Sequence, residues 1–121
     1  MEKFLSTPEA VVYRKVMNEL VVIQLHTGQM FHFSEGTQDL LNHFKKPKTL
    51  DSYLTATEIG GMPAEVEHVK ALTSFLLHHQ LLEETSVRSV EDIMTPHFPY
   101  SRPQFLRLDA KTLDEVVFLY P

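Results

Sequence analysis

Hydrophobic and polar residues change their spacing along the chain, and each change marks a different kind of segment. Three short runs rich in β-branched and aromatic side chains come first: residues 10–16, 20–26 and 29–33. Runs of this length and composition are typical of strands. Turns are expected at Asn18-Glu19 and at Thr27-Gly28, where glycine tolerates a positive φ. The pattern predicts a three-stranded antiparallel meander.

From Ser34 onward, apolar residues recur at the spacing of a helix instead. The three predicted helices lie between Ser34 and Pro47, between Thr49 or Asp51 and Gly60-Gly61, and from Pro63 to about Leu82. Ser34 is a candidate N-cap for the first helix, and Pro63 suits the first turn of the third. Three strands followed by three helices predict an α+β fold, winged-helix-like, with the helices on one face of the sheet.

After about Glu84 the periodicity is lost. Residues 85–103 contain three prolines and few regularly spaced apolar positions, as expected of a linker or an extended arm. Residues 112–120 end in an apolar run that needs something to pack on. The sequence therefore predicts a domain of residues 1–84, followed by a linker and C-terminal tail of residues 85–121.

Composition and charge narrow the range of functions. The net charge is -5, and the eleven basic residues are scattered apart from Lys45, Lys46 and Lys48, which disfavours nucleic acid as a partner. There is no cysteine, hence no disulfide or thiolate site. No signal-peptide pattern and no apolar run near the roughly 20 residues of a membrane span is present, so we expect a cytoplasmic protein without membrane contact.

Seven histidines raise the question of a metal site. His78 and His79 are adjacent and would point about 100° apart on a helix, and no His-x-x-x-His pair occurs. The sequence also lacks a glycine-rich phosphate loop and a nucleophile motif. We therefore expect a protein that is not an enzyme and binds no metal or cofactor.

Four stretches of sequence together resemble a known family. They are Leu20-Val-Val-Ile-Gln-Leu25 with Gly28, Phe31-His-Phe33-Ser34-Glu-Gly36-Thr37, the Leu40/Leu41/Phe44 helix, and the series Val66, Val69, Leu72, Phe75-Leu76 and Leu81-Leu82-Glu83. This pattern, over residues 10–84, resembles the PqqD-like family, peptide-binding domains also called RiPP recognition elements. The resemblance implies a non-catalytic domain that binds the leader of a precursor peptide and presents it to a modifying enzyme, radical or ATP-dependent.

The resemblance also implies how the peptide binds. A leader would add as an extra strand beside residues 29–33, in a groove between that strand and the third helix. The peptide-binding residues implied are Gln29, Met30, Phe31, His32, Phe33, Val69, Leu72, Phe75, Leu76 and His79. An apolar residue at helical spacing is more often part of the core, which is the alternative at each position. Phe75 and His79 lie off the centre of the apolar stripe and are the better groove candidates.

The tail carries a second pattern. Tyr100-Ser-Arg-Pro103-Gln-Phe105 has the form Tyr-x-x-Pro-x-apolar, which resembles the recognition stretch of leader peptides, including those of lasso peptides. Proline favours an extended backbone, and the two aromatic side chains suit pockets. An ordinary proline-containing arm is the alternative. We expect residues 98–108 to lie extended against residues 29–33, either in the same chain or exchanged within a homodimer.

Three other functions remain open at this stage. The fold class also fits a winged-helix-type transcriptional regulator, although the longest helix offers only Lys70 as a basic residue. The chain could instead be a precursor peptide fused to its own recognition domain, or a scaffold. Salt-sensitive DNA binding would favour the regulator, whereas binding of a Tyr-x-x-Pro peptide would favour the recognition domain.

Overall fold

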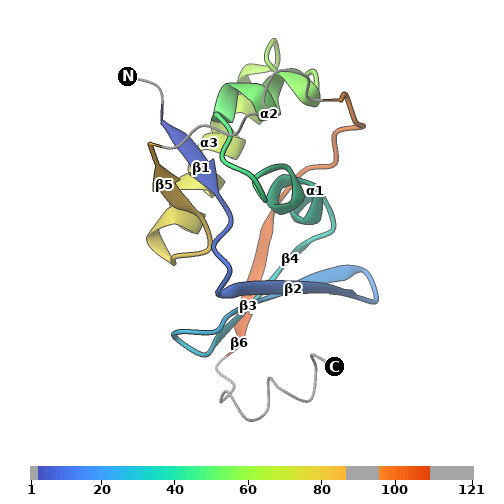
Figure 1. Cartoon of the computed structure of the whole chain (residues 1–121). Coiled ribbons are helices and arrows are strands. Elements are labelled where there is room, and N and C mark those ends of the chain that lie inside the picture. Colours follow the sequence, from blue (N-terminus) through green and yellow to red (C-terminus); the bar gives the residue numbers. More distant parts are fainter. Residues whose placement is uncertain (1–2, 87–95, 110–121) are drawn as a thin grey trace.

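The computed structural model describes residues 3–86 and 96–109, and Figure 1 shows how their elements are arranged. In chain order the elements are β1 (Phe4–Ser6), β2 (Val11–Val16), β3 (Glu19–Gln24), β4 (Gln29–Ser34), α1 (Gly36–His43), α2 (Leu50–Ala56), α3 (Pro63–His78), β5 (Glu83–Thr85) and β6 (Phe105–Asp109). The α+β class is confirmed. The single three-stranded sheet is wrong, because the described strands form a four-stranded sheet, β2-β3-β4-β6, and a two-stranded sheet, β1-β5.

The expected meander is present as β2, β3 and β4, paired antiparallel. Gly28 has φ 72° in the second turn, as its place in the sequence predicted. The first turn differs from the prediction, since Met17 adopts φ 58° and Glu19 already begins β3. This shift matters below, because it places the Glu19 carboxylate on the sheet.

The sheet has two unlike faces. The alternation of side chains along β3 and β4 directs Leu20, Val22, Phe31 and Phe33 into the main core, under the helices. The residues between them, Val21, Ile23 and Met30, form a separate buried cluster on the opposite face. His32 lies on that second face too, at 6% exposure. In β4, Phe31 and Phe33 therefore face the main core, whereas Met30 and His32 face the second side of the sheet.

The ends of the first two helices differ in how closely they follow the prediction. Helix α1 begins after Glu35, with no side-chain cap, so the proposed Ser34 cap is wrong. Ser34 stays in β4 because its amide donates to the Gln104 carbonyl and its hydroxyl donates to the Arg102 carbonyl. Helix α2 is capped by Thr49, one of the two predicted residues, whose side chain accepts from the Ser52 amide.

Helix α3 begins at Pro63 as predicted, but it ends at His78 rather than at Leu82. Gln80 adopts φ 61°, and the amides of Leu81 and Leu82 both donate to the Leu76 carbonyl. This left-handed reversal is a usual way to satisfy the last carbonyls of a helix. It sends the chain directly into β5.

Strands β1 and β5 are each three residues long, and their pairing joins the start of the chain to the end of α3. Leu5 also forms a bridge with Lys48, ahead of α2. Segments this short carry no readable period in the sequence. Residues 112–120, the predicted apolar run, lie outside the described residues. In residues 3–86 and 96–109, no helix is long and apolar enough to cross a membrane.

Candidate functional site

Strand β6 lies along the free edge of β4, as Figure 1 shows, which confirms the expected position for residues 105–108 of the tail. For residues 98–103 the expectation is wrong, because they contact α2 and α3 instead of residues 29–33. The antiparallel register pairs Phe31 with Leu108, His32 with Arg107, and Phe33 with Phe105, with a bulge between His32 and Phe33. The ladder satisfies backbone groups that an open sheet edge would leave without protein partners. The chain thus binds one of its own segments by strand addition.

Ahead of β6, residues 96–104 run extended across the helices, and we call this segment the arm. Pro103 is buried, and its carbonyl accepts a hydrogen bond from His68 Nε2 at 2.6 Å. The Tyr100 hydroxyl donates to Glu65 Oε2, and Arg102 Nε lies 3.3 Å from the same carboxylate. Burial and the hydrogen bond to Glu65 raise the pKa of Tyr100, so the hydroxyl keeps its proton. Helix α3 therefore recognises the arm through Glu65 and His68.

Gly36, at the start of α1, lets the arm approach closely. A Cβ at this position would lie 2.2 Å from the Ser101 carbonyl oxygen and 2.9 Å from the Arg102 carbonyl carbon. Real Cβ atoms do not approach backbone so closely, so any other side chain at position 36 would displace the arm. Gly36 is thus needed for the space above it, and its φ lies outside the left-handed region.

Phe98 holds the arm near α2. Its amide donates to the Ala56 carbonyl at 3.1 Å, and its ring lies 6.0 Å from the Tyr53 ring and 6.1 Å from the His43 ring, centroid to centroid. Burial, with a smaller contribution from Lys48, lowers the pKa of His43 to about 4. His43 is therefore neutral at pH 7.

Rings from β4, from the last turns of α3 and from β6 lie close to one another on the helix side of the sheet. The Phe105 ring lies 4.7 Å from Phe75 and 5.6 Å from Phe33, and His79 lies 4.4 Å from Phe75 and 5.3 Å from Phe31. These separations are within the range in which aromatic pairs attract one another. Burial, with a smaller contribution from His78, lowers the pKa of His79, which favours its neutral form beside these rings.

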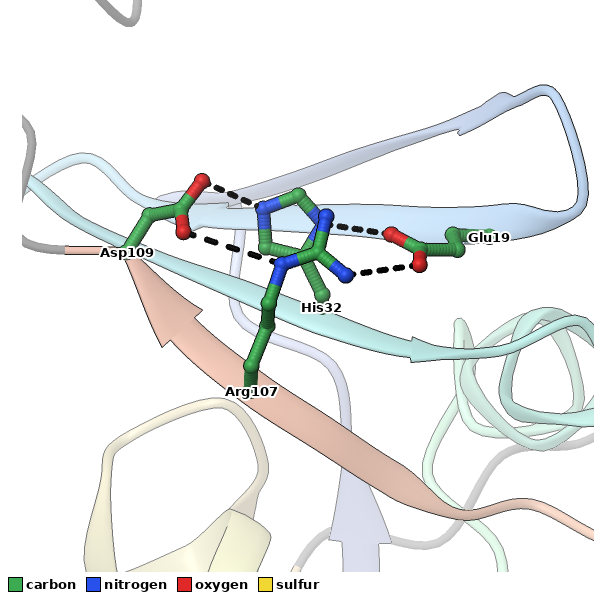
Figure 2. Close-up of polar contacts among 4 residues, drawn as sticks. All are labelled: Glu19, His32, Arg107 and Asp109. Atoms are coloured by element: carbon green, nitrogen blue, oxygen red, sulfur yellow. Dashed lines mark hydrogen bonds and ion pairs between the residues drawn. The ribbon is translucent and has the colours of Figure 1, made fainter.

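On the opposite face, four charged or ionisable side chains form a closed ring, shown in Figure 2. We call it the outer clamp: Glu19, His32, Arg107 and Asp109. His32 Nδ1 lies 2.9 Å from Glu19 Oε2, and His32 Nε2 lies 2.7 Å from Asp109 Oδ2. Arg107 Nη1 donates to Glu19 Oε1 at 2.7 Å, and Arg107 Nε lies 3.8 Å from Asp109 Oδ1.

Acidic and basic side chains alternate around this ring. Each imidazole nitrogen of His32 meets one carboxylate, and an imidazole donates to two carboxylates at once only when it carries a proton on each nitrogen. Hydrogen bonds from Arg107 and then His32 lower the pKa of Glu19, and the bond to Glu19 raises that of Arg107. Each carboxylate therefore lies between His32 and Arg107, and each of these two lies between the two carboxylates.

The predicted site residues are divided between several places. Phe33 and Phe75 contact the Phe105 ring of β6, and Phe31 and His79 complete the same group of rings. Phe31 and Phe33 also belong to the buried core, together with Val69, Leu72 and Leu76, as the alternative allowed. Met30 and His32 lie on the other face, and Gln29 pairs with Gln24 in the β3-β4 ladder. Tyr100, Pro103 and Phe105 all contact the domain.

Sequence reasoning missed the polar contacts between the domain and the tail. They join Glu19, Ser34, Glu65 and His68 of the domain to the tail, whose own polar side chains in β6 are Arg107 and Asp109. It also missed Gly36, which gives the arm room. The pair Arg107-x-Asp109, directly after the aromatic of the motif, was a readable signal, since alternate residues of a strand share one face. No corresponding signal marks Gly36, because the close approach arises from the path of the arm.

Residues 3–86 and 96–109 contain no cluster of His, Asp or Glu side chains arranged to hold a metal ion. Comparison with protein-family models, curated proteins and solved structures found no match to this chain.

Proposed function

We propose that this chain is a non-catalytic peptide-binding domain that binds a leader-like peptide by strand addition and presents it to a modifying enzyme. The observation that carries the proposal is the bound segment of the chain itself. Residues 98–109 combine a β-ladder, a buried proline and side-chain contacts on both faces of the sheet. The resemblance of the domain to the PqqD-like family and of the segment to a leader motif supports the same function.

The contacts divide into a general part and a selective part. Backbone pairing to β4 would accept almost any extended sequence, because it uses only main-chain groups. Selection would come from Glu65, which accepts a hydrogen bond from the tyrosine hydroxyl, and from the Phe33 and Phe75 rings, which contact Phe105. The bond from His68 to the Pro103 carbonyl uses a main-chain group and belongs to the general part. A peptide with the Tyr-x-x-Pro-x-aromatic pattern satisfies all of these contacts together.

The bound strand also leaves a surface for a second protein. Phe105, Leu106 and Leu108 remain 37%, 43% and 47% exposed while they are part of the sheet. Exposed apolar side chains on an edge strand suit a further protein contact. A modifying enzyme would meet the domain and the held peptide as one surface.

The tail fills the groove in the same chain, so an external leader must displace it. A tethered segment has an effective concentration of about millimolar, which would mask even tight binding in trans. The test therefore uses the full chain with a protease site inserted between Ser86 and Pro96. After cleavage, every described residue is still present, but the tail can exchange.

A fluorescent peptide with the sequence of residues 96–109 is then added to cleaved and uncleaved protein, and anisotropy is measured. We expect saturable exchange, in the micromolar range or tighter, with the cleaved protein and little exchange with the uncleaved control. Replacing Phe105 by alanine in the peptide should weaken binding by about 30-fold, since a partly buried aromatic is lost. A cleaved protein that takes up no peptide would contradict the proposed function.

A further inference from the structure

We propose that Glu19 and His32 form a second recognition site, which selects peptides carrying a basic residue and an acidic residue two and four positions after the aromatic of the motif. In this chain those residues are Arg107 and Asp109. The inference rests on the proposed function. It deepens that function by naming a further chemical feature of the peptide.

The position of the site follows from the strand geometry. Arg107 and Asp109 are two residues apart in β6, so both side chains point to the face opposite the helices. The register sets Arg107 opposite His32 and Asp109 opposite Met30. Glu19 is two strands away from Arg107, but its side chain reaches Arg107 Nη1 at 2.7 Å. A basic-x-acidic pair therefore meets both groups of the domain at once.

With β6 in place, the domain's own two residues also contact each other. His32 Nδ1 contacts Glu19, which leaves Nε2 directed towards the incoming strand. Glu19 correspondingly offers its second oxygen to a cation on that strand. Arg14 of β2 lies on the same face, paired with Val21, one strand beyond. The site thus presents Glu19 as an acceptor for the basic residue of the strand and His32 Nε2 as a donor for the acidic residue two positions later.

The fixed order discriminates between peptides more than it adds to affinity. A strand with the two charges reversed would place a carboxylate near Glu19 and a guanidinium near His32. The carboxylate of the peptide would be repelled by Glu19, and its guanidinium would find no acceptor at His32. Unfavourable contacts of this kind are an effective source of specificity. Exposed ion pairs contribute little to affinity by themselves, so a neutral strand should bind better than a reversed one.

The experiment compares three peptides of residues 96–109 as competitors in the cleaved full-length protein. They are the parent peptide, a neutral peptide with Arg107→Gln and Asp109→Asn, and a reversed peptide with Arg107→Asp and Asp109→Arg. We expect the neutral peptide to bind about threefold more weakly than the parent, because exposed ion pairs add little to affinity. The reversed peptide should bind about 50-fold more weakly, because repulsion is added to the lost contacts.

A change of protein provides the matched control. In protein carrying Glu19→Gln and His32→Gln, the three peptides should bind within about threefold of one another. Protein carrying the same chemical changes at exposed positions, Glu67→Gln and His26→Gln, should still distinguish them. Equal binding of parent and reversed peptides to the unchanged protein would overturn the outer-clamp inference alone. Failure of the parent peptide to bind would overturn the proposed function instead.

Discussion

The two halves of the bound tail are held in different ways. Strand β6 is attached through a regular ladder along β4, with aromatic rings on one face and the outer clamp on the other. The arm, residues 96–104, has no strand partner among the described residues. It is fixed at separate points by Ala56, Glu65, His68 and the space above Gly36.

This difference suggests that the two halves contribute differently to affinity and to selectivity. A ladder repeats the same bond at each step and tolerates changes of side chain, so β6 is suited to give affinity. Several contacts of the arm also use its main-chain atoms, as at Ser34 and His68. Its selectivity therefore rests on the Tyr100 and Arg102 side chains, which both meet Glu65. The bulge opposite the His32-Phe33 step lies within β6, where Leu106 is the extra residue between the paired Phe105 and Arg107.

The largest expected effect comes from blocking the arm at Gly36. Gly36→Ala adds a methyl group 2.2 Å from the Ser101 carbonyl oxygen, which the arm can avoid only by leaving its path. We expect about 100-fold weaker binding of the 96–109 peptide to the cleaved protein. In the uncleaved chain, the Ser34 amide, which donates to Gln104, should lose its protection from hydrogen exchange.

Gly60→Ala is the matched control for this change. No atom lies within 4 Å of a Cβ built at Gly60, and its φ also lies outside the left-handed region. This variant should bind the peptide as the unchanged protein does. Normal peptide binding by Gly36→Ala would mean that β6 holds the tail without help from the arm.

The sequence predicted the parts of the fold that have a clear period. The meander and the start of α3 at Pro63 followed from alternation, from Gly28 and from the preference of proline for a first helical turn. Strands β1 and β5 were missed because three residues cannot display a period. The Ser34 cap was wrong because a tertiary partner, the arm, took the hydroxyl that would have capped α1.

The candidate site was predictable where it depends on the backbone and much less where it depends on polar side chains. The docking of the tail on β4 was expected from two resemblances, that of the domain to strand-adding peptide binders and that of Tyr100–Phe105 to a leader motif. The role of His32 in the outer clamp did not follow, because His32 was predicted as part of the groove beside α3. Strand parity puts it on the other face, where Glu19 becomes its partner only once the first turn is placed correctly.

The second expected effect concerns the acid stability of the region under the arm. Burial lowers the pKa of His43 from 6.5 to about 4, so the unfolded chain takes up a proton before the folded protein does. Stability is therefore present above pH 6.5 and falls as the pH drops towards 4. We expect a loss of about 2 kcal/mol in the free energy of unfolding between pH 7.5 and pH 5, measured by urea denaturation.

His43→Gln tests the assignment of this loss. Burial lowers the pKa of His79 as well, so His79 also reduces stability as the pH falls. The contribution of His43 is therefore the difference in lost unfolding free energy between the unchanged protein and His43→Gln. The lowered pKa of Glu19 affects stability only as the pH falls below its ordinary value of 4.5, outside this window. The variant should lose less stability than the unchanged protein, whereas His26→Gln, at an exposed position, should behave as the unchanged protein. If all three proteins lose the same free energy of unfolding between pH 7.5 and pH 5, protonation of His43 does not cause the loss.

The smallest expected effect tests most directly whether the arm contributes to binding apart from strand β6. Tyr100→Phe in the peptide keeps the ring and removes the hydroxyl that donates to Glu65. We expect about fivefold weaker binding, equivalent to about 1 kcal/mol for one hydrogen bond to a carboxylate that remains partly exposed. In Glu65→Gln protein this penalty should shrink, because the charged acceptor is gone. If the two peptides bind both proteins equally well, the ladder of β6 carries the recognition and the arm merely follows it.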